Sequence, residues 1–283
     1  MRVTIFGATG LLGKALMREW KEDDVTGFGS ADGDIRDSEQ VLRLVQRERP
    51  DWIVLAAAFT DVDGCETNRD LAFNVNYRGA VNVAQAAKQH GARLLFLSTD
   101  YVFDGAKTTP YGTGDPRSPH TVYGQSKAEA EAQLETLLQC CIVRTSWLFG
   151  TGGKCFPDTI LKLAATRPRL EVVGDQRGSP TYSVDLARAL IQLCRQGASG
   201  MVHVTNRGEC SWYEFASEII ACSGLDTIVR ETTSDKFVRP AERPKYSVLS
   251  PESLEKRGIA MPGWQDALQR YLAERASTLS RTT

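Results

Sequence analysis

The sequence lacks long hydrophobic runs and a large excess of charge of either sign. No apolar stretch approaches the roughly 18 residues that a membrane-spanning helix needs, and the chain opens on a strand-like segment instead of a signal peptide. We therefore expect a cytoplasmic protein that has no membrane partner. The formal net charge is −1 and the basic residues are scattered, so the basic surface that nucleic-acid binding requires is not expected either.

Cysteine and histidine are present without the spacing of metal or redox sites. The seven cysteines contain no C-x-x-C pair. The three histidines, His90, His120 and His203, lie far apart in the sequence. We therefore expect no metal site, and we expect most cysteines to be small core or near-surface residues.

The N-terminal segment has the spacing of a dinucleotide-binding turn. A predicted strand over residues 2–6 leads into three glycines and then an amphipathic helix. The first glycine permits a tight turn, the second removes a Cβ that would block a pyrophosphate, and the third lets the helix pack closely on the strand. Amides at the helix N-terminus then face the diphosphate. The predicted cofactor contacts here are Gly7, Thr9, Gly10, Leu11, Leu12 and Gly13.

The adenosine end of this predicted site is less clear. After a second strand over 25–28, the residues that would meet the ribose are small and neutral, so a choice between NADH and NADPH stays open. Asp34 and Ile35 are predicted to bracket the adenine. A buried strand over 52–55 then leads to Ala56, Ala57 and Ala58, whose small side chains would let the cofactor lie near the backbone, unless they form an ordinary packed strand end. Thr60 opens the next loop and joins the predicted contacts.

A tyrosine and a lysine four residues apart form the candidate catalytic pair. Tyr123 and Lys127 lie on one face of a helix predicted over 123–139. A nearby ammonium lowers the pKa of a phenol, which favours proton transfer. The pair alone is weak, because Tyr-x-x-x-Lys is common on ordinary helices. A buried strand over 94–97 brings Thr99 to the same sheet edge, where its hydroxyl can meet a carbonyl or merely cap a turn.

Alternating strand and helix patterns over 1–147 predict an α/β protein with a Rossmann-like, doubly wound parallel sheet. Residues 182–206 are predicted to rejoin this dinucleotide-binding domain. Residues 148–181 and 207–283 are predicted to form a smaller, discontinuous α/β substrate-binding domain, with helices over 157–166, 212–223 and 264–275 and with loops between the last two. We expect a cleft between the domains.

Together, the glycine turn, Ser98-Thr99-Asp100 and Tyr-x-x-x-Lys resemble an extended short-chain dehydrogenase/reductase over nearly the whole chain. The segments 98–105, 144–150, 178–181 and 243–244 resemble the dTDP-4-dehydrorhamnose reductases more narrowly. Related sugar-nucleotide 4,6-dehydratases carry an acid where Tyr101 stands, so dehydration is not expected.

This resemblance implies hydride transfer from NADPH or NADH to the C4 ketone of a nucleotide-linked deoxysugar. The reaction would convert dTDP-4-dehydro-L-rhamnose to dTDP-L-rhamnose, a precursor of cell-surface polysaccharide. Tyr123 would protonate the oxygen, Thr99 would polarise the carbonyl, and Lys127 would keep Tyr123 acidic and contact the nicotinamide ribose. The residues implied around the sugar are Thr60, Val62, Asp100, Tyr101 and Trp147.

Several alternatives remain open at this level. Trp147 equally suits a core position, and the basic cluster over 236–245 suits either the diphosphate or a solvated face. A non-catalytic regulatory subunit of the methionine adenosyltransferase type resembles the same reductases, and another nucleotide-sugar reductase or epimerase is a third possibility. A monomer or a homodimer is expected. Some relatives dimerise through a metal held partly by a glutamate where Ala15 stands, which argues against that assembly here.

Overall fold

The computed structural model describes residues 1–137 and 139–280. The larger part of the protein is built on a six-stranded parallel sheet whose strand order is β10-β5-β4-β3-β1-β2. The chain passes from β1 to β2 and then crosses back to β3 on the other side of β1, so the order reverses between β1 and β3. Open parallel sheets bind ligands at such a switch point. The strands are β1 (Arg2–Phe6), β2 (Asp24–Phe28), β3 (Trp52–Leu55), β4 (Arg93–Thr99), β5 (Cys140–Thr145) and β10 (Gly200–His203).

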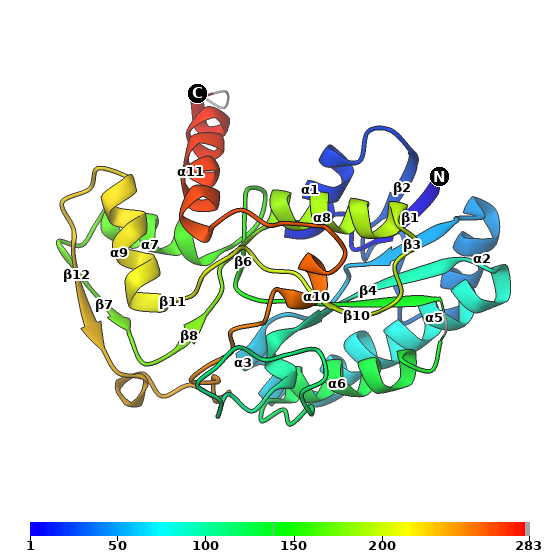
Figure 1. Cartoon of the computed structure of the whole chain (residues 1–283), viewed down its shortest axis with the longest axis horizontal. Coiled ribbons are helices and arrows are strands. Elements are labelled where there is room, and N and C mark those ends of the chain that lie inside the picture. Colours follow the sequence, from blue (N-terminus) through cyan, green and yellow to red (C-terminus); the bar gives the residue numbers. More distant parts are fainter. Residues whose placement is uncertain (138, 281–283) are drawn as a thin grey trace.

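Helices cover both faces of this sheet (Figure 1). Two of them, α1 (Leu11–Glu19) and α8 (Ser183–Arg195), pack on one face. The other face is covered by α2 (Ser38–Glu48), α5 (Gly79–His90) and α6 (Val122–Leu134). Because both faces are buried, the central strands are nearly continuous apolar runs. The predicted doubly wound α/β sheet is confirmed.

One helix predicted as continuous is interrupted. In place of a single helix over 72–90, α4 (Arg69–Phe73) passes through a π-helical turn, η1 (Asn74–Arg78), into α5. The turn carries the buried Asn76, whose Oδ1 accepts from Phe59 N at 2.8 Å and whose Nδ2 donates to Ser126 Oγ at 3.0 Å. Single π-turns are frequent at functional sites. This one ties the segment after β3 to α6. Of the helix predicted over 123–139, α6 ends at Leu134, and Leu138 lies outside the described residues.

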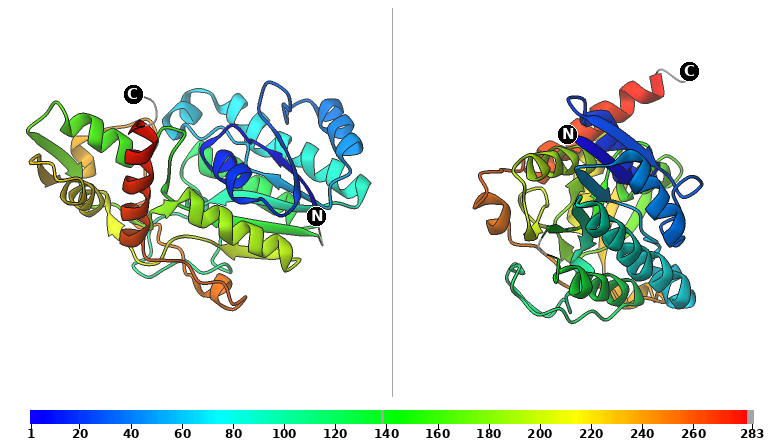
Figure 2. Two further views of the ribbon diagram at one scale, coloured as in Figure 1. Left: turned by 90° about the horizontal axis from the view of Figure 1, so that it is seen from above. Right: turned by 90° about the vertical axis from the view of Figure 1, so that its right-hand side faces the viewer.

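The sheet has one hydrophobic core on each face, between its strands and the covering helices. A third core lies beyond the carboxyl ends of the sheet (Figure 1). It is formed mainly by α7 (Phe156–Ala164), α9 (Trp212–Cys222) and α11 (Trp264–Ser280) with β7 (Arg169–Val173). Seen from above, α11 forms the side of this region that is nearest the sheet (Figure 2). None of the described helices has the length and apolarity of a membrane span.

The same region contains short strands that the sequence did not reveal. Residues 228–232 were expected in a loop, but they form β12 (Ile228–Thr232), which pairs in parallel with β7. Its side chains are mostly exposed, so it lacks the apolar alternation that marks a strand in sequence. The remaining elements are α3 (Val62–Thr67), η2 (Asp100–Val102), η3 (Ser234–Lys236), α10 (Glu252–Glu255), β6 (Leu148–Phe149) paired with β9 (Thr181–Tyr182), and β8 (Arg177–Gly178) paired with β11 (Cys210–Ser211).

Candidate active site

The glycine turn lies at the switch point between β1 and β3. Gly7 has φ +93°, and a Cβ there would lie 2.4 Å from Ala57 N. A Cβ on Gly13 would lie 2.1 Å from the carbonyl oxygen of Gly7, so α1 needs a glycine to approach β1 this closely. A Cβ on Gly10 would meet only that same oxygen, at 3.3 Å, and otherwise faces open space. The turn is therefore closed by packing at Gly7 and Gly13 and open to a ligand at Gly10.

The start of α1 suits an anion. Gly10 is the N-cap, no side chain caps the helix there, and its first turn holds no acidic residue. The first amides of a helix lack partners within the helix and carry partial positive charge. Thr9 is exposed and Leu11 is half-buried, whereas Leu12 lies in the core at 6% exposure. Leu12 thus offers a ligand its backbone only. These residues fit the diphosphate of a dinucleotide.

At the predicted adenosine end, the carboxylates of Asp32 and Asp34 are hydrogen-bonded to groups nearby in the sequence. Asp34 is paired with Arg36 at 2.6 Å, and the hydrogen bond from Arg36 holds the pKa of Asp34 below its ordinary value. Asp32 Oδ1 accepts from Gly29 N at 2.6 Å, so this carboxylate caps its own turn. Ile35 is 4% exposed and packs in the core beside α5. Its side chain is part of the core, and the predicted contact of this segment with adenine stays a prediction.

The small residues after β3 border the same switch point. The amides of Ala56 and Ala57 both donate to Phe6 O at 2.9 Å. These two residues and Ala58 are half-buried, while Thr60 is exposed. Val62 is half-buried at the start of α3. Ala56 and Ala57 therefore lie beside the glycine turn, and the cofactor contacts of this segment stay a prediction.

Thr99 and Tyr123 come together where β4 ends and α6 begins. Thr99 is 5% exposed; its Oγ1 donates to Asp100 Oδ1 at 3.0 Å and accepts from Tyr101 N at 3.2 Å. The Thr99 hydroxyl also lies near enough to the phenol of Tyr123 to favour its ionised form. The rings of Tyr101 and Tyr123 pack edge to face with centroids 5.7 Å apart. Two hydroxyl groups thus lie side by side, as a site for one carbonyl oxygen requires.

The first turn of α6 fixes the position of Tyr123. Thr121 caps the helix by accepting from Gly124 N at 3.0 Å. Glu66 of α3 accepts from Val122 N at 2.8 Å. A Cβ on Gly124 would lie 2.2 Å from Tyr101 O, so only glycine allows this approach to η2. Neither Glu66 nor Gly124 was predicted as a site residue, although Gly124 stands directly beside Tyr123.

The protonation of this pair differs from the prediction. Burial raises the pKa of Tyr123, and the nearby Thr99 hydroxyl opposes that shift only in part. Lys127 does not produce the expected lowering: its Nζ donates to Leu97 O at 2.5 Å and lies 4.0 Å from the centroid of the Phe96 ring. Burial also lowers the pKa of Lys127 to about 7, against the field of Glu131. The phenol therefore stays protonated at neutral pH, the state from which it donates a proton.

Asp100, which the sequence predicts beside the sugar, is buried directly after β4. It is 2% exposed, and its carboxylate accepts from Thr99. Burial raises the pKa of Asp100 to about 6, and its hydrogen bonds only partly counter this. In this structure Asp100 therefore orients Thr99 from behind.

A salt bridge crosses the site beside Tyr101, and sequence reasoning missed it. Arg243 donates through both terminal nitrogens to Asp63, with Nη2 2.7 Å from Oδ2, and its charge also acts on Tyr101. Ala241 N donates to Asp63 Oδ1 at 3.2 Å. Arg243 is only 18% exposed, so it is not part of a solvated basic face. Asp63 and Arg243 are 180 positions apart, and no local pattern connects them.

Trp147 follows β5 at the same sheet edge, but another ring covers one of its faces. Trp147 and Trp212 stack with centroids 3.4 Å apart and planes within 5°. Gly178 also lies against the ring, since a Cβ there would be 2.4 Å from its Cε2 atom. Trp147 has φ +46°, which is uncommon for a bulky residue. Trp147 is half-buried and packs against the third core.

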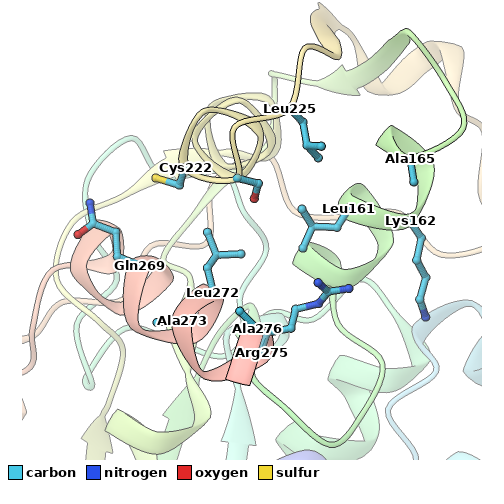
Figure 3. Close-up of a pocket in the computed structure, with 11 residues that line it drawn as sticks. Leu161, Lys162, Ala165, Cys222, Leu225, Gln269, Leu272, Ala273, Arg275 and Ala276 are labelled. Atoms are coloured by element: carbon cyan, nitrogen blue, oxygen red, sulfur yellow. The ribbon is translucent and has the colours of Figure 1, made fainter. Parts of the chain in front are cut away.

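Two hollows differ in their relation to this site. A pocket of about 200 Å³ adjoins Tyr101 and is bordered by Asp104, His120 and Arg243. A larger groove of about 710 Å³ lies between α7, α9 and α11, where Leu161 faces Leu272 (Figure 3). It contains none of the predicted site residues. Within the described ranges, no group of three or more His, Cys, Asp or Glu residues is placed to hold a metal.

Comparison with known proteins agrees with this geometry. Residues 1–277 match the family described as RmlD substrate binding domain. The chain is 43% identical over 279 residues to the spore coat polysaccharide biosynthesis protein SpsK of Bacillus subtilis (strain 168), covering 98% of each chain. It is 38% identical to the dTDP-4-dehydrorhamnose reductase of Mycobacterium tuberculosis (strain ATCC 25618 / H37Rv), covering 99% of this chain and 95% of the relative.

A solved structure agrees as closely. The dTDP-4-dehydrorhamnose reductase of Bacillus anthracis str. Ames, in complex with NADP, superposes with a TM-score of 0.94 at 40% identity. The alignment covers 96% of this chain and 99% of the other. The resemblance inferred from the motifs is confirmed, and the chain belongs to the RmlD substrate binding domain family.

Proposed function

We propose that this protein reduces the C4 ketone of a nucleotide-linked deoxysugar with NADPH or NADH, converting dTDP-4-dehydro-L-rhamnose to dTDP-L-rhamnose. The observation that carries the proposal is the approach of the Thr99 hydroxyl to the Tyr123 phenol at the carboxyl edge of the sheet, where Tyr101 contacts both residues. The glycine turn at the switch point supports it, as do relatives named for this reaction. The solved relative in complex with NADP supports the cofactor class.

The chain's own residues would bind the cofactor and the sugar, orient the ketone and protonate its oxygen. The bound cofactor supplies the hydride. Tyr123 donates its proton to the developing alkoxide, a much stronger base than a phenolate, so the raised pKa of Tyr123 does not prevent the transfer. The Thr99 hydroxyl points to Asp100 in this structure and turns to the ketone oxygen when substrate binds. Lys127 leaves Leu97 O to contact the nicotinamide ribose.

The remaining predicted residues would form the substrate side. We infer that residues 148–181 and 207–283 hold the nucleotide sugar against the sheet edge. Tyr101 and Thr60 would contact the sugar, as would Val62, and Trp147 would meet it along the part of its ring that Trp212 leaves uncovered. Arg243 would anchor the loop over the sugar through Asp63.

The test is ketone-dependent consumption of reduced nicotinamide. Purified protein is given dTDP-4-dehydro-L-rhamnose with NADPH or with NADH, and the sugar product is identified by NMR. We expect turnover with at least one cofactor and its loss in Tyr123→Phe. Tyr213→Phe is the matched control, because it removes a phenolic hydroxyl from α9 in the third core. Absence of turnover by the unmodified protein with both cofactors would refute the proposal.

A further inference from the structure

A buried ion network lies one helical turn beyond Lys127. Arg144 of β5 donates from Nε and Nη2 to the two carboxylate oxygens of Glu131, at 2.9 and 2.6 Å. Glu131 is 0% and Arg144 1% exposed. A second guanidinium, that of Arg117, reaches Glu131 at 3.3 Å. The network joins α6, the sheet and the loop before α6 inside the protein.

Removing charges from water is costly, and a well-packed apolar pair is often at least as stable as a buried ion pair. Nothing in the hydride-transfer scheme uses Glu131 or Arg144. Their position next to a residue of the site points to a further role.

The geometry directs this network toward Lys127. Glu131 and Lys127 are four residues apart on α6, so they share one face of the helix. Arg144 lies in register with Ser98 on β4, two residues from Phe96, whose ring lies under the Lys127 ammonium. Glu131 is the charged group whose field acts on Lys127. The neighbouring elements also carry ionisable groups: Tyr123 on α6, Asp100 after β4, Arg144 on β5, His203 on β10 and Arg117 in the loop before α6.

We propose that Glu131, held by Arg144 and Arg117, is a positioning residue that keeps the Lys127 ammonium charged inside the protein. This inference rests on the proposed role of Lys127 at the cofactor ribose. The two guanidinium groups fix the carboxylate and neutralise part of its charge, and the remaining field acts on Lys127.

The charge states of the neighbouring groups agree with a negative field from Glu131 at Lys127. Burial lowers the pKa of Lys127, and Glu131 is the charged neighbour that raises it again. His203 Nε2 lies 3.4 Å from Arg144 Nη1. Burial and that guanidinium lower the pKa of His203 to about 3, so this histidine is neutral near pH 7. Glu131 is therefore the anion that opposes the loss of the lysine's charge.

The experiment measures the pKa of Lys127 directly. Protein labelled with carbon-13 at lysine Cε is titrated by NMR without substrate or cofactor, and the Lys127 signal is assigned from Lys127→Arg. In Glu131→Gln the pKa of Lys127 should fall by about one pH unit, because the opposing anion is gone. In Arg117→Gln it should rise by roughly half a unit, because a cation is removed and Glu131 is less neutralised. Glu135→Gln, which removes the exposed partner of Arg117, should leave it unchanged.

Shifts of opposite sign would not arise from a general loosening of the helix. The high-pH limit of kcat/KM should move in the same directions. If Glu131→Gln does not fold, the result for Arg117→Gln is decisive. A rise in the pKa of Lys127 in this variant supports the proposal, and an unchanged pKa overturns it. An unchanged pKa in both folded variants overturns it as well. Since the titration needs no substrate, a wild-type protein that reduces no ketone would refute the proposed function and still leave this inference to be judged by NMR.

Discussion

Replacing Asp63 by asparagine should weaken the attachment of the loop over Tyr101. The Asp63 carboxylate accepts hydrogen bonds from both terminal nitrogens of Arg243 and from the Ala241 amide. Arg239 makes a more distant contact with it, at 3.4 Å. The amide of asparagine keeps the shape but loses the charge and one acceptor. Arg243 is then left half-buried without its carboxylate.

The expected magnitude follows from the proton affinity of the carboxylate. The hydrogen bond from Arg243 is the largest cause that lowers the pKa of Asp63 from 3.8 to about 2. At about 1.4 kcal/mol per pH unit, this sets an upper limit of about 2.5 kcal/mol. The Asp63 side chain is 28% exposed, so solvent screens the pair, and we expect Asp63→Asn to lower the free energy of unfolding by about 1–1.5 kcal/mol.

The dependence on pH has a definite sign. Because the folded protein lowers the pKa of Asp63, the stabilisation is fully present above about pH 4 and is lost as the pH falls toward 2. Urea unfolding at pH 7, 4 and 3 should therefore show the difference between Asp63→Asn and wild type shrinking at the lowest pH. Asp61→Asn is the control, since Asp61 caps the same helix and asparagine caps equally well. Equal stability of wild type and Asp63→Asn at pH 7, or a difference independent of pH, would refute this reasoning.

Three further outcomes are expected. Gly13→Ala should lower the free energy of unfolding in urea by about 1–3 kcal/mol, because its Cβ meets the backbone of the glycine turn. Gly10→Ala should cost less than about 1 kcal/mol in the same assay yet weaken NADPH binding, followed by fluorescence, by at least about tenfold; unchanged affinity would contradict the assigned pyrophosphate position. Ser211→Ala breaks a capping box with Glu214 and should cost about 1 kcal/mol, with Ser217→Ala on the same helix as the control.

Local patterns in the sequence predicted the glycine turn and the meeting of Thr99 with Tyr123. Both depend on short segments whose partners are set by the parallel sheet, because consecutive parallel strands end at one edge. Gly7 and Gly13 are needed for contacts within the first 57 residues, so spacing alone revealed them. The alternation of strand and helix patterns was enough to predict the parallel sheet.

The rest depends on tertiary contacts that spacing does not encode. The pairing of Asp63 with Arg243 joins segments 180 positions apart. The burial of Asp100 and the turn of Lys127 toward Leu97 O depend on how tightly α6 packs on β4. The stacking of Trp212 on Trp147 is likewise set by the third core. The sequence therefore indicated Asp100, Lys127 and Trp147 as candidate functional residues, but not the partners that the fold gives them.

The central claim is that Tyr123 and Thr99 hold one ketone oxygen beside the cofactor. The most direct measurement is a crystal structure of the protein with oxidised nicotinamide cofactor and dTDP-L-rhamnose. We predict that O4 of the sugar lies within hydrogen-bond reach, about 2.6–3.2 Å, of both Tyr123 Oη and Thr99 Oγ1. A sugar bound with O4 directed away from both hydroxyl groups would contradict the account.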